Sequence, residues 1–196
     1  PDKLDQKIIS LLSQGNNVKA IVAVDYAGNP CDWAALRRIA DQYKLQLIND
    51  NCHALGAEYK GSKGYAIENA DIVIQSYHPV KHITCGEGGA VFTNNPTLKR
   101  ITESFRDWGR DCFCPTGKNN TCGKRFCWQK GELPFGYDHK FIYSHVGYNL
   151  KISDMQAAVG LSQLQKLTSF IETRKKNFTW LHKRLQTVKE FFILPE

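Results

Sequence analysis

Lys81 stands between a predicted strand end and a glycine-rich turn. Its amine can form a Schiff base with an aldehyde cofactor, and the hydroxyl of Ser76, five residues earlier, can bind a phosphate. The glycines after the lysine allow the backbone to approach such a ligand closely. A lysine taken alone is usually a solvated surface charge, but these neighbours favour a residue that holds an aldehyde cofactor. The segment reads Ser76-Tyr77-His78-Pro79-Val80-Lys81-His82-Ile83-Thr84-Cys85-Gly86-Glu87-Gly88-Gly89-Ala90.

This segment resembles the signature of the DegT/StrS-type sugar aminotransferases, which are fold type I enzymes that use pyridoxal 5'-phosphate. The signature reads Ser-aromatic-x-x-x-Lys followed by Thr-x-Gly-Glu-Gly-Gly. The resemblance implies that Lys81 is the Schiff-base lysine and that Ser76 contacts the cofactor phosphate. Eight positions match the signature at the right spacing, namely Ser76, Tyr77, Lys81, Thr84, Gly86, Glu87, Gly88 and Gly89.

An aspartate and a histidine follow a second predicted strand, at residues 45–48. Asp50 comes at the carboxyl end of this strand, and open α/β sheets bind ligands at that edge. A carboxylate there can pair with the pyridine nitrogen of the cofactor and strengthen the ring as an electron sink. The resemblance places His53 near the same ring. Without the lysine segment, a turn-capping aspartate and a core histidine would be the preferred interpretation.

A third landmark is Gly147-Tyr148-Asn149-Leu150-Lys151-Ile152-Ser153-Asp154 and the helix predicted after it, for which Ser153 or Asp154 is the expected N-cap. The resemblance implies that Asn149 reaches the cofactor phosphate of the neighbouring subunit. It therefore implies a homodimer with shared active sites. The residues by themselves indicate only a loop followed by an amphipathic helix.

Four cysteines lie close together later in the chain. One residue separates Cys112 from Cys114, seven separate Cys114 from Cys122, and four separate Cys122 from Cys127. Disulfides would need an oxidising compartment, whereas a cofactor enzyme of this class is expected in the cytoplasm, where thiols stay reduced. Thiolates in close array bind zinc or an iron–sulfur cluster, usually through four ligands. Zinc, an iron–sulfur cluster and unligated thiols are the three interpretations.

The spacing of these cysteines resembles the 2Fe–2S motif of the CDP-6-deoxyhexulose 3-dehydrases, relatives of the sugar aminotransferases that act in dideoxysugar and lipopolysaccharide O-antigen biosynthesis. The resemblance implies four cluster ligands, Cys52, Cys112, Cys114 and Cys122, with Cys127 as a spare. Cys52 follows the cofactor aspartate, and 59 residues separate it from Cys112. The neighbouring segments 106–111 and 136–140 also resemble this subgroup.

One position departs from the subgroup, because those dehydrases carry a histidine where this chain has Lys81. They use pyridoxamine 5'-phosphate and remove the C3 hydroxyl of a nucleotide-linked 4-keto-6-deoxyhexose, with electrons from a flavin/iron–sulfur reductase. A lysine is instead typical of transamination, in which it also shuttles protons. We favour a 3-dehydrase-like enzyme, and a nucleotide-sugar aminotransferase is the alternative.

Composition, charge and the motifs together argue against several other functions. The chain has 196 residues, 42% of them hydrophobic, and a formal net charge of +7, which suits an anionic nucleotide-diphosphate sugar. Nucleic acid is disfavoured because the basic residues are dispersed, and every apolar run is too short for a membrane span. A zinc-binding module would leave Asp50, Ser76 and Lys81 unexplained. A pyridoxal enzyme that acts on amino acids would leave the cysteines unexplained.

Strand and helix patterns alternate along the first half of the chain and predict an α/β fold. Residues 4–12 and 33–43 have helical periodicity, and residues 20–24, 45–48, 70–75 and 90–93 have strand character. We expect the large domain of a fold type I enzyme, with a doubly wound, mostly parallel sheet and helices on both faces. Residues 1–160 would belong to this domain, with a cysteine-rich insert at about 108–146. Residues 161–196 would be a helical connection to a small C-terminal domain, and the chain is expected to be a fragment.

Overall fold

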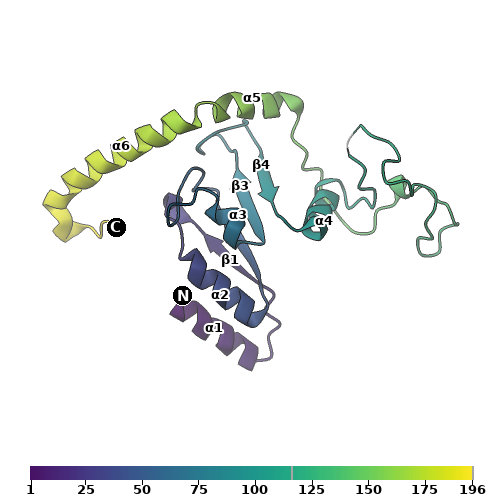
Figure 1. The fold of residues 1–196 in the computed structure, drawn as a ribbon, viewed down its shortest axis with the longest axis horizontal. Coiled ribbons are helices and arrows are strands. Elements are labelled where there is room, and N and C mark those ends of the chain that lie inside the picture. The colour runs from purple at the N-terminus through teal and green to yellow at the C-terminus, as the bar shows by residue number, and fades with distance from the viewer. Residues whose placement is uncertain (116, 196) are drawn as a thin grey trace.

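The computed structural model describes residues 1–115 and 117–195, and its centre is a sheet of four strands (Figure 1). The strand order is β1 (Ala20–Val24), β2 (Gln46–Asp50), β3 (Ile72–Ser76) and β4 (Gly89–Phe92). The first three strands are parallel, and β4 pairs with β3 in the antiparallel sense. The structure thus confirms the predicted α/β fold with a mostly parallel sheet.

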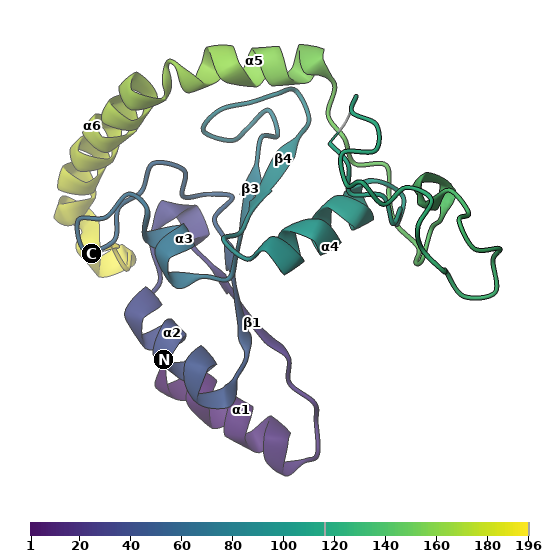
Figure 2. The ribbon, with the colours of Figure 1, turned by 45° about the vertical axis from the view of Figure 1, so that its right-hand side comes forward.

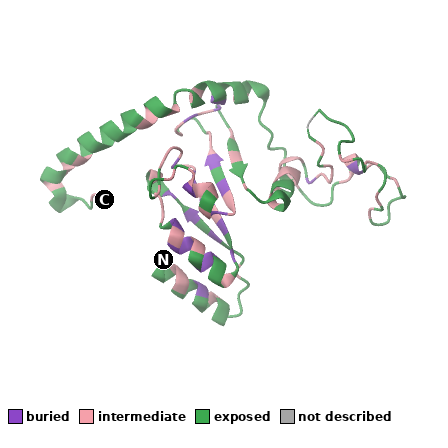
Figure 3. Cartoon of the chain, in the orientation of Figure 1, coloured by how far each residue is buried: buried purple, intermediate pink, exposed green. Residues whose placement is uncertain are grey.

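Three helices cover one face of this sheet. They are α1 (Asp2–Ser13), α2 (Trp33–Tyr43) and α3 (Tyr65–Asn69). Alternate strand residues point toward them, so that Ile21, Leu47 and Val73 pack with helix side chains into one buried cluster (Figure 3). The helix α2 begins where the Asp32 side chain accepts a hydrogen bond from the Ala35 N–H.

The opposite face of the sheet is more exposed. Val22 and Val24 are 62% and 42% exposed, and Ile74 is 37% exposed. The prediction places helices on both faces, but within the described residues no helix buries these three side chains. The two helices that follow the sheet, α5 (Asp154–Leu164) and α6 (Leu167–Leu185), instead form an arc past the carboxyl ends of the strands (Figures 1 and 2).

The segment between the sheet and this arc contains α4 (Pro96–Arg106) and the cysteine-rich insert. Between α4 and α5 the described residues form loops and one 3₁₀ helix, η2 (His139–Phe141). Both views show this segment extending away from the sheet, beyond α4 (Figures 1 and 2). Two further 3₁₀ helices are η1 (Tyr26–Gly28) and η3 (Gln186–Phe191).

Helix α5 begins where the sequence predicts. The Ser153 hydroxyl accepts a hydrogen bond from the Gln156 N–H, and the Gln156 side chain accepts one from the Ser153 N–H. This reciprocal capping box satisfies two of the free N–H groups at the helix start. Helix α6 leaves large apolar side chains uncovered in this chain, since Phe178 and Leu181 are 53% and 50% exposed. In the part of the chain that the structure describes, no helix is long and apolar enough to span a membrane.

Candidate active site

The carboxyl edge of the parallel strands carries the predicted cofactor residues. Asp50 is the last residue of β2 and is paired in register with Val24 of β1 and Ile74 of β3. Side chains alternate along a strand, so Asp50 lies on the face opposite to α1, α2 and α3. Ser76 lies two residues beyond Ile74 and therefore points to the same face. The structure thus places Asp50 and Ser76 at one edge and on one side.

Cys52 lies beside this carboxylate, and Lys81 lies close to Cys52. Burial, with a hydrogen bond to Asp50, raises the pKa of the Cys52 thiol to about 11, while the nearby Lys81 cation acts in the opposite direction. The Cys52 N–H also donates to the Asp50 carboxylate, over 3.2 Å. The Cys52 thiol is therefore protonated at neutral pH in this structure, and the lysine, thiol and carboxylate form one group.

His53 and His82 complete this group. The Ala27 N–H donates to His53 Nδ1 over 3.4 Å, and the Tyr26 and His53 ring centroids are 5.8 Å apart. Burial lowers the pKa of His82, and the charges of Arg174, His53 and Lys81 lower it further. His82 Nδ1 is buried and has no hydrogen-bond partner among the described residues. His82 thus presents a ring nitrogen that is buried and unpaired within the described residues, near Lys81, His53 and Arg174.

The glycine-rich turn is packed tightly against the sheet and α5. A Cβ on Gly89 would lie 2.7 Å from the Gln75 carbonyl oxygen, and a Cβ on Gly160 would lie 2.4 Å from Cys85 Sγ. The Gln156 side chain donates to the Glu87 carbonyl over 3.1 Å. Glycine is required at both contacts, because any side chain would displace the turn from its place beside Ser76 and Lys81. This close backbone packing, together with Asp50 and Lys81 at one edge, fits pyridoxal phosphate.

Helix α6 adds a residue that the sequence does not single out. Arg174 lies close enough to His82 to lower its pKa. Ile171, one turn earlier, approaches Gly56, where an added Cβ would lie 2.2 Å from the Ile171 side chain. These contacts join segments more than 90 residues apart, so no local pattern could predict them.

A second cluster of functional side chains lies in the insert. The thiols of Cys112, Cys114 and Cys122 are neighbours, because each of the latter two affects the pKa of Cys112, which is raised mainly by burial. A hydrogen bond from Thr121 is the main reason that the pKa of Cys114 is lowered to about 7. The Cys114 thiol is therefore partly ionised at neutral pH.

His139 is the buried centre of this second cluster. Its side chain is fully buried, its Nε2 lies 3.4 Å from Cys122 Sγ, and its ring centroid is 4.8 Å from that of Trp128. Burial lowers the pKa of His139, and its Nδ1 has no partner among the described residues. His139 lies in the segment 136–140 that resembles the dehydrase subgroup, but no sequence pattern assigns this residue a role.

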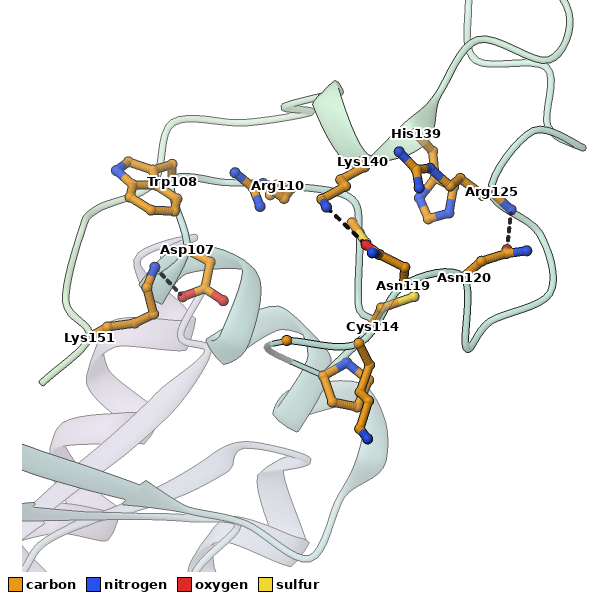
Figure 4. Close-up of a pocket in the computed structure, with 14 residues that line it drawn as sticks. Asp107, Trp108, Arg110, Cys114, Asn119, Asn120, Arg125, His139, Lys140 and Lys151 are labelled. Atoms are coloured by element: carbon orange, nitrogen blue, oxygen red, sulfur yellow. Dashed lines mark hydrogen bonds and ion pairs between the residues drawn. The ribbon is translucent and has the colours of Figure 1, made fainter. Parts of the chain in front are cut away.

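A basic cavity of about 450 Å³ opens beside these residues (Figure 4). Arg125 is paired with Asp138 over 2.7 Å, and Lys151 with Asp107 over 3.2 Å. The other basic side chains in the lining lack a carboxylate partner within the described residues. The lining includes Asp107, Trp108, Arg110, Cys112, Cys114, Lys118, Arg125, His139, Lys140 and Lys151.

The structure does not bring all predicted ligands together. Cys52 contacts Asp50 and the Ile74 carbonyl at the sheet edge, whereas the other three cysteines lie in the insert. Among residues 1–115 and 117–195, no three His, Cys, Asp or Glu side chains converge in an arrangement that would hold a metal ion. One chain in this conformation therefore does not assemble the predicted four-thiolate site.

Asn149 also lies apart from the edge. It is exposed and forms an isolated antiparallel bridge with Asp107, at the base of the insert. The neighbouring Tyr148 and Leu150 hydrogen-bond to the end of α4 through the Phe105 and Arg106 carbonyls. These contacts fix the backbone of Asn149 and leave its side chain exposed.

Residues 4–196 match the DegT/DnrJ/EryC1/StrS aminotransferase family. The chain belongs to this family. Membership confirms the resemblance drawn from the lysine segment and, with the aminotransferases among its structural neighbours, supports pyridoxal phosphate as the cofactor.

Relatives in this family include proteins of sugar metabolism. The lipopolysaccharide biosynthesis protein RfbH of Salmonella typhimurium is 56% identical over 178 residues, which cover 91% of this chain and 40% of the relative. The dTDP-4-dehydro-2,6-dideoxy-D-glucose 3-dehydratase of Saccharopolyspora spinosa is 47% identical over 167 residues, which cover 85% of this chain and 36% of the relative. The chain thus spans about two fifths of the length of these relatives.

Solved structures agree with the fold. A GDP-4-keto-6-deoxymannose-3-dehydratase with bound GDP-perosamine has a TM-score of 0.68 and 26% identity, covering 91% of this chain and 44% of the other. The Helicobacter pylori aminotransferase PseC, involved in the biosynthesis of pseudoaminic acid, has a TM-score of 0.64 and 28% identity, covering 89% of this chain and 40% of the other.

The low pKa of Cys114 leads to a pH-dependent prediction. Only the thiolate reacts with iodoacetamide, so in the iron-free protein alkylation of Cys114 should be half-maximal near pH 7 and should slow as the pH falls. Thr121→Val removes the main cause of the lowered pKa and should move this midpoint to higher pH. Mass spectrometry of each cysteine peptide across the pH series measures the effect.

Thr102→Val is the matched control, because the Thr102 hydroxyl donates to the Leu98 carbonyl over 2.9 Å within α4. Cys112, whose pKa is raised, should react only at higher pH than Cys114 in the same samples. An unchanged Cys114 midpoint in Thr121→Val would contradict the role given to the threonine.

Proposed function

We propose that this chain is the cofactor-binding part of a pyridoxal phosphate-dependent enzyme that acts on a nucleotide-linked 4-keto-6-deoxyhexose. We further propose 3-dehydrase-like chemistry, with removal of the C3 hydroxyl, in deoxysugar and lipopolysaccharide biosynthesis. The observation that carries the proposal is the grouping of Lys81 with Asp50 at the carboxyl edge of the sheet. The 3-dehydratases among the relatives support the substrate class.

Each residue at the edge has a defined task in this proposal. Asp50 holds the proton on the ring nitrogen of the cofactor, and His53 packs near the ring. Ser76 and the glycine-rich turn bind the phosphate. When bound, the cofactor acts as an electron sink for bonds next to the reacting carbon. Lys81 would hold the cofactor covalently and, when its amine is free, would move a proton to or from the substrate carbon.

Lys81 also favours a second candidate, a nucleotide-sugar aminotransferase. A lysine amine can release its bond to the cofactor when a substrate amine arrives, which is the first requirement of transamination. The insert favours the dehydrase, because transamination needs neither a group of thiols nor a thiolate at neutral pH. The two candidates share the sheet edge and differ in whether the insert takes part.

We propose that a 2Fe–2S cluster is held by Cys112, Cys114, Cys122 and Cys52. Three of these thiols are neighbours, and Cys114 is substantially ionised near neutral pH, as thiolate ligation requires. Cys52 is separate from them in one chain, so we place the fourth ligand on the partner subunit of a homodimer. Two-fold symmetry would then form two equivalent sites, each from both chains.

The homodimer, with Asn149 directed to the partner's cofactor phosphate, is part of the same proposal. The exposed position of Asn149 at the base of the insert supports it. The basic cavity and the net charge of +7 suit an anionic nucleotide-diphosphate sugar, and a flavin/iron–sulfur reductase is the proposed electron donor. Reduced thiols and a nucleotide-linked substrate suit a cytoplasmic enzyme.

The first prediction concerns Lys81. In the full-length protein, Lys81→Ala should abolish the visible absorbance of covalently attached pyridoxal phosphate, because Lys81 is the amine proposed to bind it covalently. Absorbance titration measures the loss. Lys63→Ala is the control, since the Lys63 side chain is 80% exposed and is paired with Glu58 over 3.9 Å. Unchanged absorbance in Lys81→Ala would show that Lys81 does not bind the cofactor.

The second prediction separates the two candidate reactions. The full-length enzyme is given a CDP-4-keto-6-deoxyhexose, glutamate, a flavin/iron–sulfur reductase and reduced nicotinamide, and the product mass is measured. We expect loss of the C3 oxygen. Replacement of the keto oxygen by an amine would instead establish the aminotransferase, and it would show that Lys81 decides the chemistry.

The third prediction concerns the shared cluster. A heterodimer of one Cys52→Ser subunit and one Cys114→Ser subunit should hold about half the iron of the wild-type dimer, because both substitutions fall in one site and leave the other intact. Each homodimeric variant should lose its iron while it keeps pyridoxal phosphate. Iron analysis and visible spectra of tag-purified heterodimers measure this.

The iron content of these variants tests the sharing of the cluster and the existence of the cluster separately. Cys127→Ser is the control and should keep full iron, because Cys127 is exposed and is the spare cysteine. A heterodimer without iron would place all four ligands in one chain. A wild-type enzyme without iron would overturn the cluster itself and favour the aminotransferase.

A further inference from the structure

A buried carboxylate lies directly beneath the candidate active site. Asp25 follows the last residue of β1 and is fully buried. Its Oδ1 accepts hydrogen bonds from the Cys31 N–H over 2.9 Å and from Trp33 Nε1 over 3.0 Å. Four of its five hydrogen-bond donors are N–H groups, which can only donate. The carboxylate is therefore surrounded by donors on both oxygens, and no cation neutralises it within the described residues.

The other oxygen joins Asp25 to the neighbouring strand and to α3. Asp25 Oδ2 accepts from Asn49 Nδ2 over 3.0 Å, from Asn51 Nδ2 over 2.9 Å and from the Tyr65 hydroxyl over 2.7 Å. Asn51 Nδ2 also lies 2.9 Å from the Tyr65 hydroxyl. A buried polar group is costly unless it is hydrogen-bonded, so this arrangement resists any movement that removes a donor.

The two asparagines flank the cofactor aspartate. Asn49 and Asn51 are directed toward Asp25, on the face that α2 and α3 cover. Successive side chains of a strand point to opposite faces, so fixing residues 49 and 51 on one face directs Asp50 to the other. The two hydrogen bonds to Asp25 thus hold Asn49 and Asn51 on one face, and Asp50 between them lies on the other.

The same network extends to the phosphate side of the site. The Gln75 side chain is buried and donates to the Asn51 side-chain oxygen. Gln75 directly precedes Ser76 in β3, so the same alternation directs Ser76 to the face of Asp50. One buried carboxylate therefore governs the direction of a residue on each of two strands.

Asp25, Asn49, Asn51 and Gln75 form a polar layer, which differs from the apolar core farther from the strand ends. Farther from the edge, the same face of the sheet carries Ile21, Leu47 and Val73, which pack without directional bonds. A structural core needs only such contacts, whereas hydrogen bonds to a fixed acceptor also specify orientation. The polar layer occurs where the strands end beside Asp50 and Ser76.

We propose that Asp25 is a positioning residue, which orients Asp50 and Ser76 toward the pyridoxal phosphate through Asn49, Asn51 and Gln75. This inference rests on the proposed function, because it takes the cofactor role of Asp50 from it. Asp25 itself does not touch the cofactor.

The test uses the full-length enzyme and the variant Asp25→Asn, which keeps the side-chain size but replaces one acceptor oxygen with an amide N–H₂ that faces donors. The dissociation constant for pyridoxal phosphate should rise about tenfold or more. The pH midpoint of the visible absorbance of bound cofactor should shift in the same direction as in Asp50→Asn. A merely structural role would lower the melting temperature and leave this midpoint unchanged.

Two tyrosines provide a matched pair that changes the fold less. Tyr65→Phe removes one of the five donors to Asp25 and should shift the midpoint in the same direction by a smaller amount. Tyr59→Phe removes a similar bond, from the Tyr59 hydroxyl to Asp32 over 2.8 Å, and does not involve Asp25. It should leave the midpoint and the cofactor affinity unchanged.

Each outcome is decisive. If Asp25→Asn does not fold, Tyr65→Phe decides alone, and an unchanged midpoint with a lowered melting temperature overturns the inference. If Asp50→Asn binds the cofactor with wild-type affinity and an unchanged midpoint, the proposed role of Asp50 fails. The pH midpoint of the cofactor absorbance could also shift in Asp50→Asn but in neither Asp25→Asn nor Tyr65→Phe. That result overturns the positioning role of Asp25 and leaves the proposed function in place.

Discussion

The buried carboxylate of Asp25 is the interaction on which the carboxyl edge of the sheet depends. It lies where three parallel strands end, and it accepts hydrogen bonds from β2, from α3 and from the segment that begins α2. Apolar packing alone would hold these strands together but would not specify the direction of their last side chains. The structure therefore combines an apolar base, which supplies stability, with a polar layer at the edge, which supplies orientation.

The chain separates two kinds of thiol chemistry. At the sheet edge, burial beside Asp50 raises the pKa of Cys52 to about 11. In the insert, a hydrogen bond from Thr121 is the main cause that lowers the pKa of Cys114 to about 7. The same side-chain type is thus protonated in one place and partly ionised in the other, because burial and a neighbouring carboxylate raise a thiol pKa, whereas a hydrogen-bond donor lowers it.

The glycine-rich turn connects the edge to the helices that follow. On one side, Gly89 packs against Gln75 of β3. On the other side, Gly160 of α5 packs against Cys85 of the turn. These close approaches fix the turn that carries Lys81, and α6 then brings Arg174 toward His82. The lysine segment thus depends on helices that lie more than 60 residues later in the sequence.

Much of the local structure was determined by the sequence itself. The strand patterns at residues 20–24 and 70–75, the capping residue Ser153 and the lysine signature all predicted features that the structure or the family match confirms. These features depend on the periodicity of side chains and on hydrogen bonds between residues a few positions apart, which a sequence shows directly.

Other features were decided only by the tertiary structure. These include the network around Asp25, the burial of His139 beside Cys122, the approach of Arg174 to His82, and the separation of Cys52 from the other cysteines. The spacing of cysteines predicts which residues share a chemistry, but it cannot place them in one site. The physical reason is that each of these features joins or separates segments far apart in the chain, and only the packing of the sheet, the insert and the helices sets those distances.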